Sequence, residues 1–317
     1  MKTTGTVKVH CISRTLSPLT HMMETAGNES IINREKIFHK GTVKSIPVIS
    51  GNAIRHKMLR EPGGMYLVEQ CGLKGKLTID QANYMFYGGA LTESTVAENM
   101  KTLAGLKELF PLYRLLGGSL RNQIIAGSII VQRGILVCEE NREVLEVSLP
   151  ENYNLPEQQL KSSEEFIKEY QYTRSDIQKS KEGTEILKAE EQEGETKTNL
   201  MIYNGQSIIP GTLFYHGFIL QNISRLEVGA FFHSLQNWKD SGGIIGGYSR
   251  IGHGRLDLNF IMEDSEDFIT AADIEVCISE YKSHVETNKE KCIKWLNDNF
   301  QDKKKKTEKQ EVLIDGE

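Results

Sequence analysis

A glycine-rich stretch late in the chain has the residue types and spacing most suited to holding a ligand. It runs from Ser241 to Arg255 as SGGIIGGYSRIGHGR, and six of its fifteen residues are glycine. Glycine lets the backbone adopt positive φ and approach a ligand closely. Arg250, His253 and Arg255 stand among the glycines and favour an anionic ligand. The same composition also suits a turn-rich connection beneath a core strand, and both interpretations stay open.

A second candidate is the early segment Gly51–Arg60, which the pattern predicts to be a helix with Ser50 as its N-cap. Its N-terminal amides and a basic exposed face would form a phosphate site. An ordinary amphipathic helix with a solvated basic face explains the pattern as well. At 100° per residue, Ile54 and Met58 fall on one stripe of this helix. The opposite, polar stripe holds Asn52, His56 and Arg60, and it is flanked by Arg55 and Lys57.

Familiar catalytic and metal motifs are missing from the sequence. No lysine follows the glycines of Ser241–Arg255, so a P-loop for nucleoside triphosphates is not indicated. The eight histidines are scattered, no Cys-x-x-Cys pair occurs, and no nucleophile elbow is present. We therefore expect neither a metal nor a cofactor. Acid–base chemistry by His21, Glu24 or Glu29 in an early loop is conceivable, although these residues also suit a solvated loop.

Composition indicates a soluble globular protein of a reducing cytoplasm. The 317 residues are 38% hydrophobic, carry a net charge of −5, and include five widely spaced cysteines. We see no signal peptide and no apolar run long enough for a membrane span. Over residues 1–121, Lys and Arg number 16 against 9 Asp and Glu, whereas over residues 151–199 they number 7 against 12. A basic N-terminal region is compatible with nucleic-acid binding despite the overall acidity.

The elements around these candidates predict an α+β fold with a mostly antiparallel, ferredoxin-like sheet. Val7, Val9 and Cys11 alternate with polar residues as in a half-buried strand, and residues 13–30 resemble an irregular loop. Residues 200–262 follow the order strand, strand, helix, glycine-rich loop, strand. Single-stranded RNA is often bound by such a sheet.

The predicted organisation has four parts. Residues 1–150 and 200–262 form an RRM-like palm with a helical insertion at about 65–122, and residues 263–300 form a C-terminal helix. Residues 151–199 are rich in Glu, Lys, Gln and Ser and are predicted to be a mobile, thumb-like insertion. Residues 301–317, with Lys303–Lys306, are predicted to be a disordered tail.

The segment IPVISGNAIRHKMLR at residues 46–60, together with IIPGTLFY at residues 208–215 and the glycine-rich stretch, resembles the RAMP superfamily. Within it the chain is most similar to the Cas seven family, the backbone subunits of CRISPR effector complexes. LLGGSL at residues 115–120, ILVCE at 135–139 and YTR at 172–174 are most similar to the type IV branch. The resemblance extends to about residue 262.

This resemblance implies a guide-RNA-binding protein with an RRM-like palm and a protruding thumb. Copies would polymerise as a helical filament along a guide RNA within an antiviral ribonucleoprotein complex, beside other subunits, and present the guide for pairing with target nucleic acid. The residues it implies as RNA contacts are Ser50, Gly51, Asn52, Arg55 and Arg60 in the first helix, Gly243, Gly246, Gly247, Arg250 and His253 in the glycine-rich loop, and Tyr172 and Arg174 in the thumb.

Type III relatives cut target RNA with an early-loop aspartate, and this chain departs from that pattern. The comparable stretch, Ser30–Glu35, contains no aspartate, and neither does any position from 1 to 79. We therefore expect a binder that is not an enzyme. Two alternatives remain: a metal-independent ribonuclease using His21, Glu24 or Glu29, and a globular scaffold without any nucleic-acid role.

Overall fold

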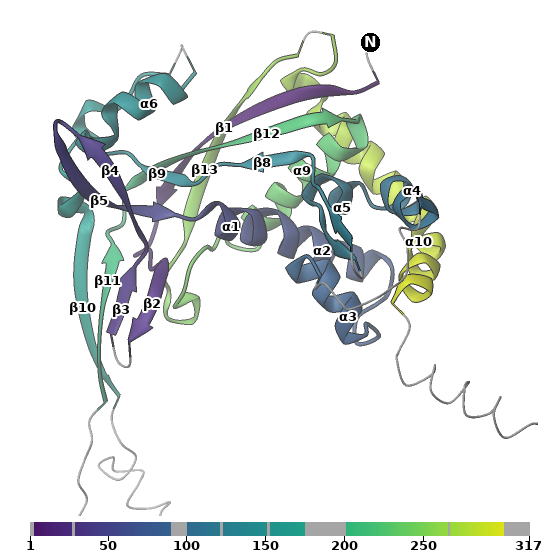
Figure 1. The fold of residues 1–317 in the computed structure, drawn as a ribbon, viewed down its shortest axis with the longest axis horizontal. Helices are drawn as coiled ribbons and strands as arrows, with labels where there is room; N and C mark the ends of the chain where they lie inside the picture. The colour runs from purple at the N-terminus through teal and green to yellow at the C-terminus, as the bar shows by residue number, and fades with distance from the viewer. Residues whose placement is uncertain are drawn as a thin grey trace, which may run out of the picture.

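The computed structural model describes residues 3–26, 29–89, 100–120, 123–150, 153–174, 201–265 and 267–300. Its centre is a seven-stranded sheet in the order β13-β1-β12-β9-β5-β4, in which β8 also pairs with β12 (Figure 1). The pairings within this sheet are antiparallel. The strands are β1 (Gly5–Thr15), β4 (Arg34–His39), β5 (Thr42–Ile49), β8 (Ile129–Val131), β9 (Gly134–Leu136), β12 (Leu213–Ile223) and β13 (Leu256–Glu263).

The core of this sheet has the ferredoxin-like strand order. A helical segment, residues 51–70, lies in sequence between β1 and the β8–β9 strands, and α9 (Arg225–Asp240) lies between β12 and β13. Their spatial order, β13-β1-β12 and then β8 or β9, is the fourth–first–third–second order of a split β-α-β unit. The predicted α+β class with a mostly antiparallel, palm-like sheet is confirmed.

Local sequence explains the main elements of the palm. Val7, Val9 and Cys11 are buried along β1, as their alternation predicts. Helix α9 begins with a capping box between Ser224 and Glu227, which satisfies N–H groups at its first turn. Its inner face then buries an apolar stripe of Val228, Phe231, Phe232 and Leu235.

The helices described between residues 51 and 116, together with α10, gather beside the sheet and form a helical lobe (Figure 1). The longest, α10 (Ile274–Asn299), packs along α9 and buries Tyr281 and Trp295. The lobe contains α1 (Gly51–Ile54), the π-helix η1 (Arg55–Arg60), α2 (Glu61–Gln70), α3 (Ile79–Ala82), the π-helix η2 (Asn83–Tyr87), α4 (Met100–Leu109) and α5 (Pro111–Leu116).

Two smaller sheets complete the described fold. The order of one is β10-β11-β3-β2, and its β11–β3 pair is parallel. The other is the β6–β7 pair. Residues 13–30 are thus not one irregular loop, because β2 and the start of β3 form there. The bounds are β2 (Met22–Ala26), β3 (Glu29–Ile32), β6 (Gly118–Leu120), β7 (Gln123–Ile125), β10 (Ile167–Arg174) and β11 (Met201–Ile208).

Residues 153–174, the first described part of the predicted insertion at 151–199, pack against the rest of the fold. Within residues 153–174, Leu160 and Phe166 are buried, and β10 pairs with β11 along its whole length. The Glu140 carboxylate also accepts the backbone N–H of Ser163, which fixes this segment to the palm. The average composition of residues 151–199 is polar, so it gave no indication that a few apolar residues anchor this segment. Residues 175–200 and the tail at 301–317 lie outside the described residues.

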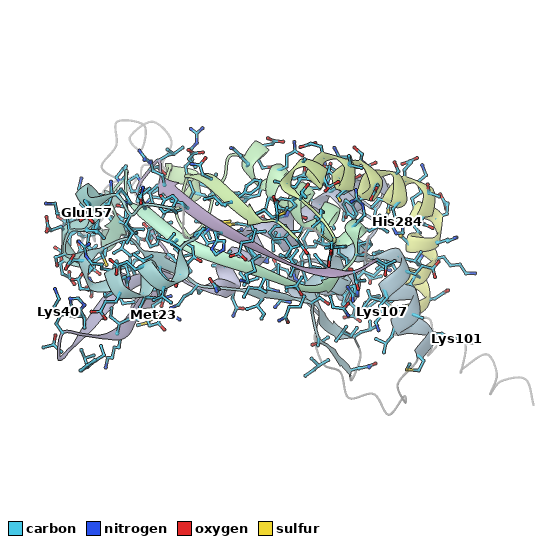
Figure 2. All side chains as sticks on the ribbon, turned by 90° about the horizontal axis from the view of Figure 1, so that it is seen from above. Met23, Lys40, Lys101, Lys107, Glu157 and His284 are labelled. Atoms are coloured by element: carbon cyan, nitrogen blue, oxygen red, sulfur yellow. The ribbon has the colours of Figure 1, made fainter. Side chains whose placement is uncertain are left out.

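Short helices occupy several connections, and the molecule is elongated. They are η3 (Glu139–Asn141), α6 (Arg142–Ser148), η4 (Glu157–Gln159), η5 (Ser163–Phe166), η7 (Ser249–Ile251) and η8 (Ala271–Asp273). Figure 2 places Lys40 and Glu157 at one end, and Lys101 and His284, which belong to the helical lobe, at the other. The palm with its long strands connects the two ends.

Candidate nucleic-acid interface

The start of the first helix faces an open groove of about 600 Å³. Ser50 is the predicted N-cap, since its Oγ accepts the backbone N–H of Ala53 at 3.2 Å. The opposite wall comes from β8, β9, the two residues between them, and α6. The lining residues are Ser50, Gly51, Asn52, Arg55, Ile129, Val131, Gln132, Arg133, Ile135, Val144 and Ser148. Four of the predicted RNA contacts therefore line one groove.

Arg55 is the cation available in this groove. Among the described residues no hydrogen-bond partner reaches its buried Nε atom. Burial lowers the pKa of its guanidinium, which remains charged at neutral pH because an arginine side chain ordinarily titrates far above it. The second arginine of the groove is paired instead: Arg133 Nε lies 2.5 Å from Glu35 Oε2. A partly desolvated cation beside a helix N-terminus fits a phosphate group.

Gly51 explains how the helix comes so close to the opposite wall. A Cβ at this position would lie 2.8 Å from the Val131 carbonyl oxygen. Real Cβ atoms do not approach backbone oxygens so closely, so any other residue would push the helix away from β8. Here glycine shapes the groove by letting two backbone segments approach each other.

Arg60 does not belong to the groove, contrary to the prediction. It is 5% exposed, and its guanidinium donates to the carbonyls of Tyr84 (3.1 Å) and Gly117 (2.6 Å). The physical reason is the π-helical turn η1, which widens the helix and moves later residues away from the stripe expected at 100° per residue. Arg60 is a buried structural cation that holds helical-lobe segments together.

The glycine-rich loop packs against the early part of the chain. Gly247 donates its N–H to the Thr20 carbonyl at 2.7 Å, and a Cβ on Gly246 would lie 2.7 Å from the same oxygen. Gly254 has a φ of +87°, and its Cβ would lie 2.1 Å from the Ile245 carbonyl oxygen. These glycines are required by contacts within the protein. The turn-rich connection, one of the two interpretations of the sequence, accounts for them.

Other predicted residues of the loop differ in accessibility. Arg250 is exposed in the short helix η7, so its guanidinium can reach a ligand. His253 is half-buried and its Nδ1 lies 2.8 Å from Thr20 Oγ1, with a pKa lowered by burial. Gly243 is buried, has a φ of +63°, and would place a Cβ 2.7 Å from the Leu256 carbonyl oxygen. Arg250 is thus the loop's accessible cation among the predicted contacts.

The thumb residues are placed only through their backbone. Tyr172 pairs with Tyr203, and Arg174 pairs with Met201, in the β10–β11 ribbon. The side chains of Tyr172 and Arg174 lie outside the described residues. Figure 1 shows this ribbon extending away from the palm beside β2 and β3. The ribbon is therefore anchored in the smaller sheet, where β11 pairs with β3.

Two adjacent early residues connect the two predicted binding elements. Thr20 contacts the glycine-rich loop, and His21 Nε2 accepts the backbone N–H of Ser50 at 3.0 Å. Burial lowers the pKa of His21, which suits the neutral imidazole that this acceptor role needs. Of the other residues in the ribonuclease alternative, Glu29 is exposed on β3, and the Glu24 side chain lies outside the described residues.

A separate cleft of about 520 Å³ lies between the helix η1–α2 and the end of α9 with the glycine-rich loop. Its charged lining is mainly acidic, with Glu61, Glu69 and Asp240, and Lys57 is paired with Glu61 at 2.6 Å. This charge does not suit a polyanion. The groove at Arg55 is the better candidate.

Neither a metal centre nor a membrane span is found in the part of the chain that the structure describes. Its His, Cys, Asp and Glu side chains form no group of three that could hold a metal ion. Its helices are all too short or too polar to cross a membrane.

The sequence interpretation missed the far wall of the groove. Gln132 and Arg133 lie between β8 and β9, which pair antiparallel with successive parts of the same strand β12, with a shift in register between them. A local signal existed, since this polar pair interrupts the apolar run Ile124–Cys138 and Gly134 follows it. That this irregularity in the strand path faces the first helix depends on long-range strand pairing, which local patterns do not contain.

Comparison with known proteins gives a structural likeness only. No protein-family model matches the sequence, and no curated protein matches it. Among solved structures, the fold is similar to a chain described as "Type IV-B CRISPR Complex", with a TM-score of 0.55 and 17% sequence identity. The match covers 84% of this chain and 97% of that one. At this identity the likeness establishes the shared α+β fold.

Proposed function

We propose that this protein is a guide-RNA-binding subunit of a CRISPR effector complex. The observation that carries the proposal is the fold match to a chain of the Type IV-B CRISPR complex, which extends over 97% of that chain. The independent resemblance of residues 46–60 and 208–215 to the RAMP superfamily supports the same assignment. The solved neighbour is described as part of a complex, so we also propose that this chain assembles with other subunits.

The groove at the first helix would hold the backbone of the RNA. Arg55 supplies a guanidinium whose buried Nε has no hydrogen-bond partner among the described residues, and Ser50 with Gly51 positions the helix N-terminus beside it. Asn52 is exposed on the same wall and can donate a hydrogen bond to phosphate. Contacts of this kind carry no base specificity. Sequence recognition would then come from pairing between guide and target, while copies of the protein repeat along the guide.

The proposed role is binding without catalysis. In the ribonuclease alternative His21 would act as a base, but its Nε2 already accepts the Ser50 N–H and cannot take a proton without losing that bond. The sequence also has no aspartate before position 80. Incubation of the assembled complex with labelled complementary RNA tests this role. Regularly spaced products that disappear on changing His21, Glu24 or Glu29 would show an enzyme instead.

The decisive experiment is copurification from cells that express a CRISPR array. We expect a discrete RNA to accompany the protein and a helical assembly to be visible by electron microscopy. Arg55→Ala should reduce RNA retention, whereas the matched control Lys74→Ala removes an exposed cation outside the groove and should not. Affinity for single-stranded RNA should fall steeply with salt because phosphate contacts release counterions. Salt-independent binding, or equal retention by both variants, would contradict the proposal.

A further inference from the structure

An exposed aromatic stack lies on the helical lobe, outside the groove already described. Tyr87 ends the π-helix η2, and its side chain is 75% exposed. One face of its ring lies against His56, with ring centroids 5.7 Å apart and planes inclined by 19°. A large aromatic ring left this open, and already stacked on one side, presents a flat surface to solvent.

The stack is held in place by the backbone around it. The His56 ring hydrogen-bonds to the backbone of Phe86, and its Nε2 lies 3.5 Å from Glu61 Oε2. The Phe86 ring packs so tightly on Gly64 that a Cβ there would lie 3.0 Å from it. Tyr87 is therefore presented by a segment that is fixed on α2. A preformed platform loses little conformational entropy when a ligand stacks on it.

The stack begins one residue after Arg55, which lines the groove. His56 follows Arg55 directly in η1, and the charges of Arg55 and Arg60 are close enough to interact. A Cβ on Gly88, the residue after Tyr87, would lie 3.6 Å from Arg60 Cζ. This proximity lets an RNA strand whose phosphate contacts Arg55 present a neighbouring base to Tyr87. The nearby Lys57 is paired with Glu61 at 2.6 Å, so the platform is flanked by a neutralised pair.

We propose that Tyr87, supported by His56, is a stacking platform for one base of single-stranded RNA, next to the phosphate contacts at Arg55. This inference rests on the proposed function and adds a contact to the bases. Every base has a π-face, so stacking tolerates any sequence. That tolerance suits a subunit that must hold guides of many sequences in the same way.

Two RNAs of equal length test the platform, one with all its bases and one made of abasic ribose-phosphate. Both would be titrated against the full chain by fluorescence anisotropy. Base stacking is worth about 1–3 kcal/mol per base, so Tyr87→Ala should weaken binding of the base-containing RNA by about 5-fold or more. It should leave the abasic RNA unchanged. Tyr87→Phe keeps the ring and should bind both RNAs as the wild type does.

The result that overturns the platform differs from the result that overturns the proposed function. If Tyr87→Ala weakens both RNAs equally, or neither, the platform is wrong. Arg55→Ala should weaken both RNAs by the same factor, because its contact is to phosphate. If Arg55→Ala changes neither RNA, the backbone groove itself is wrong. Since the Tyr87 side chain is largely exposed, its variants should melt as the wild type does, and circular dichroism checks this.

Discussion

His21 Nε2 accepts the backbone N–H of Ser50 at 3.0 Å, and this hydrogen bond ties the early loop to the N-cap of the first helix. The preceding residue, Thr20, accepts the N–H of Gly247 through its carbonyl and contacts His253 through its hydroxyl. One dipeptide therefore positions the helix N-terminus and the glycine-rich loop. The arrangement requires a neutral His21, because a protonated Nε2 would direct a hydrogen at the Ser50 N–H.

This requirement predicts a pH dependence of stability. Burial lowers the pKa of His21 below its ordinary value of 6.5, so its contribution is complete above that pH and is lost as pH falls through the lower folded pKa. His21→Gln offers an acceptor that does not titrate. Urea unfolding at pH 7.5 and pH 5 should therefore show a smaller loss of unfolding free energy for the variant than for the wild type. Burial also lowers the pKa values of His216 and His233. Both residues are present in the variant and in the wild type, so their effect on the pH dependence of stability cancels. Equal losses would contradict the role of His21.

Arg55 and Arg60 lie five residues apart, and substituting them should have opposite effects on stability and on RNA binding. Arg60→Met leaves the carbonyls of Tyr84 and Gly117 without their donor inside the helical lobe, which costs about 1–3 kcal/mol for each unpaired group. We expect a large loss of stability in urea unfolding and unchanged RNA affinity of the folded fraction. Arg55→Ala should do the reverse, with a small change in stability and a salt dependence of RNA binding reduced by about 0.7 in log–log slope. RNA affinity lost in Arg60→Met with stability retained would refute this assignment.

The sequence predicted those elements whose patterns are local. Alternation along β1 and the Ser50 cap both appear in the structure as expected. The α+β class followed from the order of these elements. The predicted element boundaries were wrong where strand pairing is long-range. Strands β2 and β3 form in the expected loop because β3 pairs with β11, which lies more than 170 residues away in sequence.

The candidate site was only partly predictable for a similar reason. Ser50, Gly51, Asn52 and Arg55 were identified from a helix start, which is a local feature, and they line one groove. Arg60 was expected on the exposed stripe because that stripe assumes 3.6 residues per turn. The π-helical turn departs from this period, and the sequence pattern does not reveal it. The roles of the glycines could not be distinguished, since a glycine that meets a ligand and one that meets Thr20 have the same sequence signature.

The glycine-rich loop separates structural from binding residues. Gly254→Ala forces a Cβ against the Ile245 carbonyl at a φ of +87°, so we expect strong destabilisation or loss of folding. Arg250→Ala changes an exposed side chain and should leave the melting temperature unchanged. If the loop also contacts the guide, Arg250→Ala weakens RNA binding several-fold at low salt. Unaltered affinity across the salt series would assign the whole loop to the scaffold.

Removing a single carboxylate should strengthen RNA binding. Glu35 Oε2 lies 2.5 Å from Arg133 Nε at the wall of the groove, and both side chains are about half exposed. Glu35→Gln frees this guanidinium for a phosphate and removes a negative charge that repels one. Each additional phosphate contact on a single strand makes the slope of log affinity against log salt steeper by about 0.7. We therefore expect Glu35→Gln to bind RNA more tightly at low salt and to show a slope that is steeper by that amount. Anisotropy titrations at several salt concentrations measure both.

A matched variant controls for net charge alone. Glu164→Gln breaks the pair with Arg34, in which Arg34 Nη1 and Glu164 Oε1 are 2.7 Å apart and neither residue lines the groove. It changes the total charge by the same amount as Glu35→Gln. If the groove holds the RNA backbone, Glu164→Gln should leave the salt slope unchanged, because long-range charge effects are screened within about 10 Å at 0.1 M salt. Equal gains in affinity for the two variants would show that overall charge, and not the Arg55–Arg133 groove, governs RNA binding.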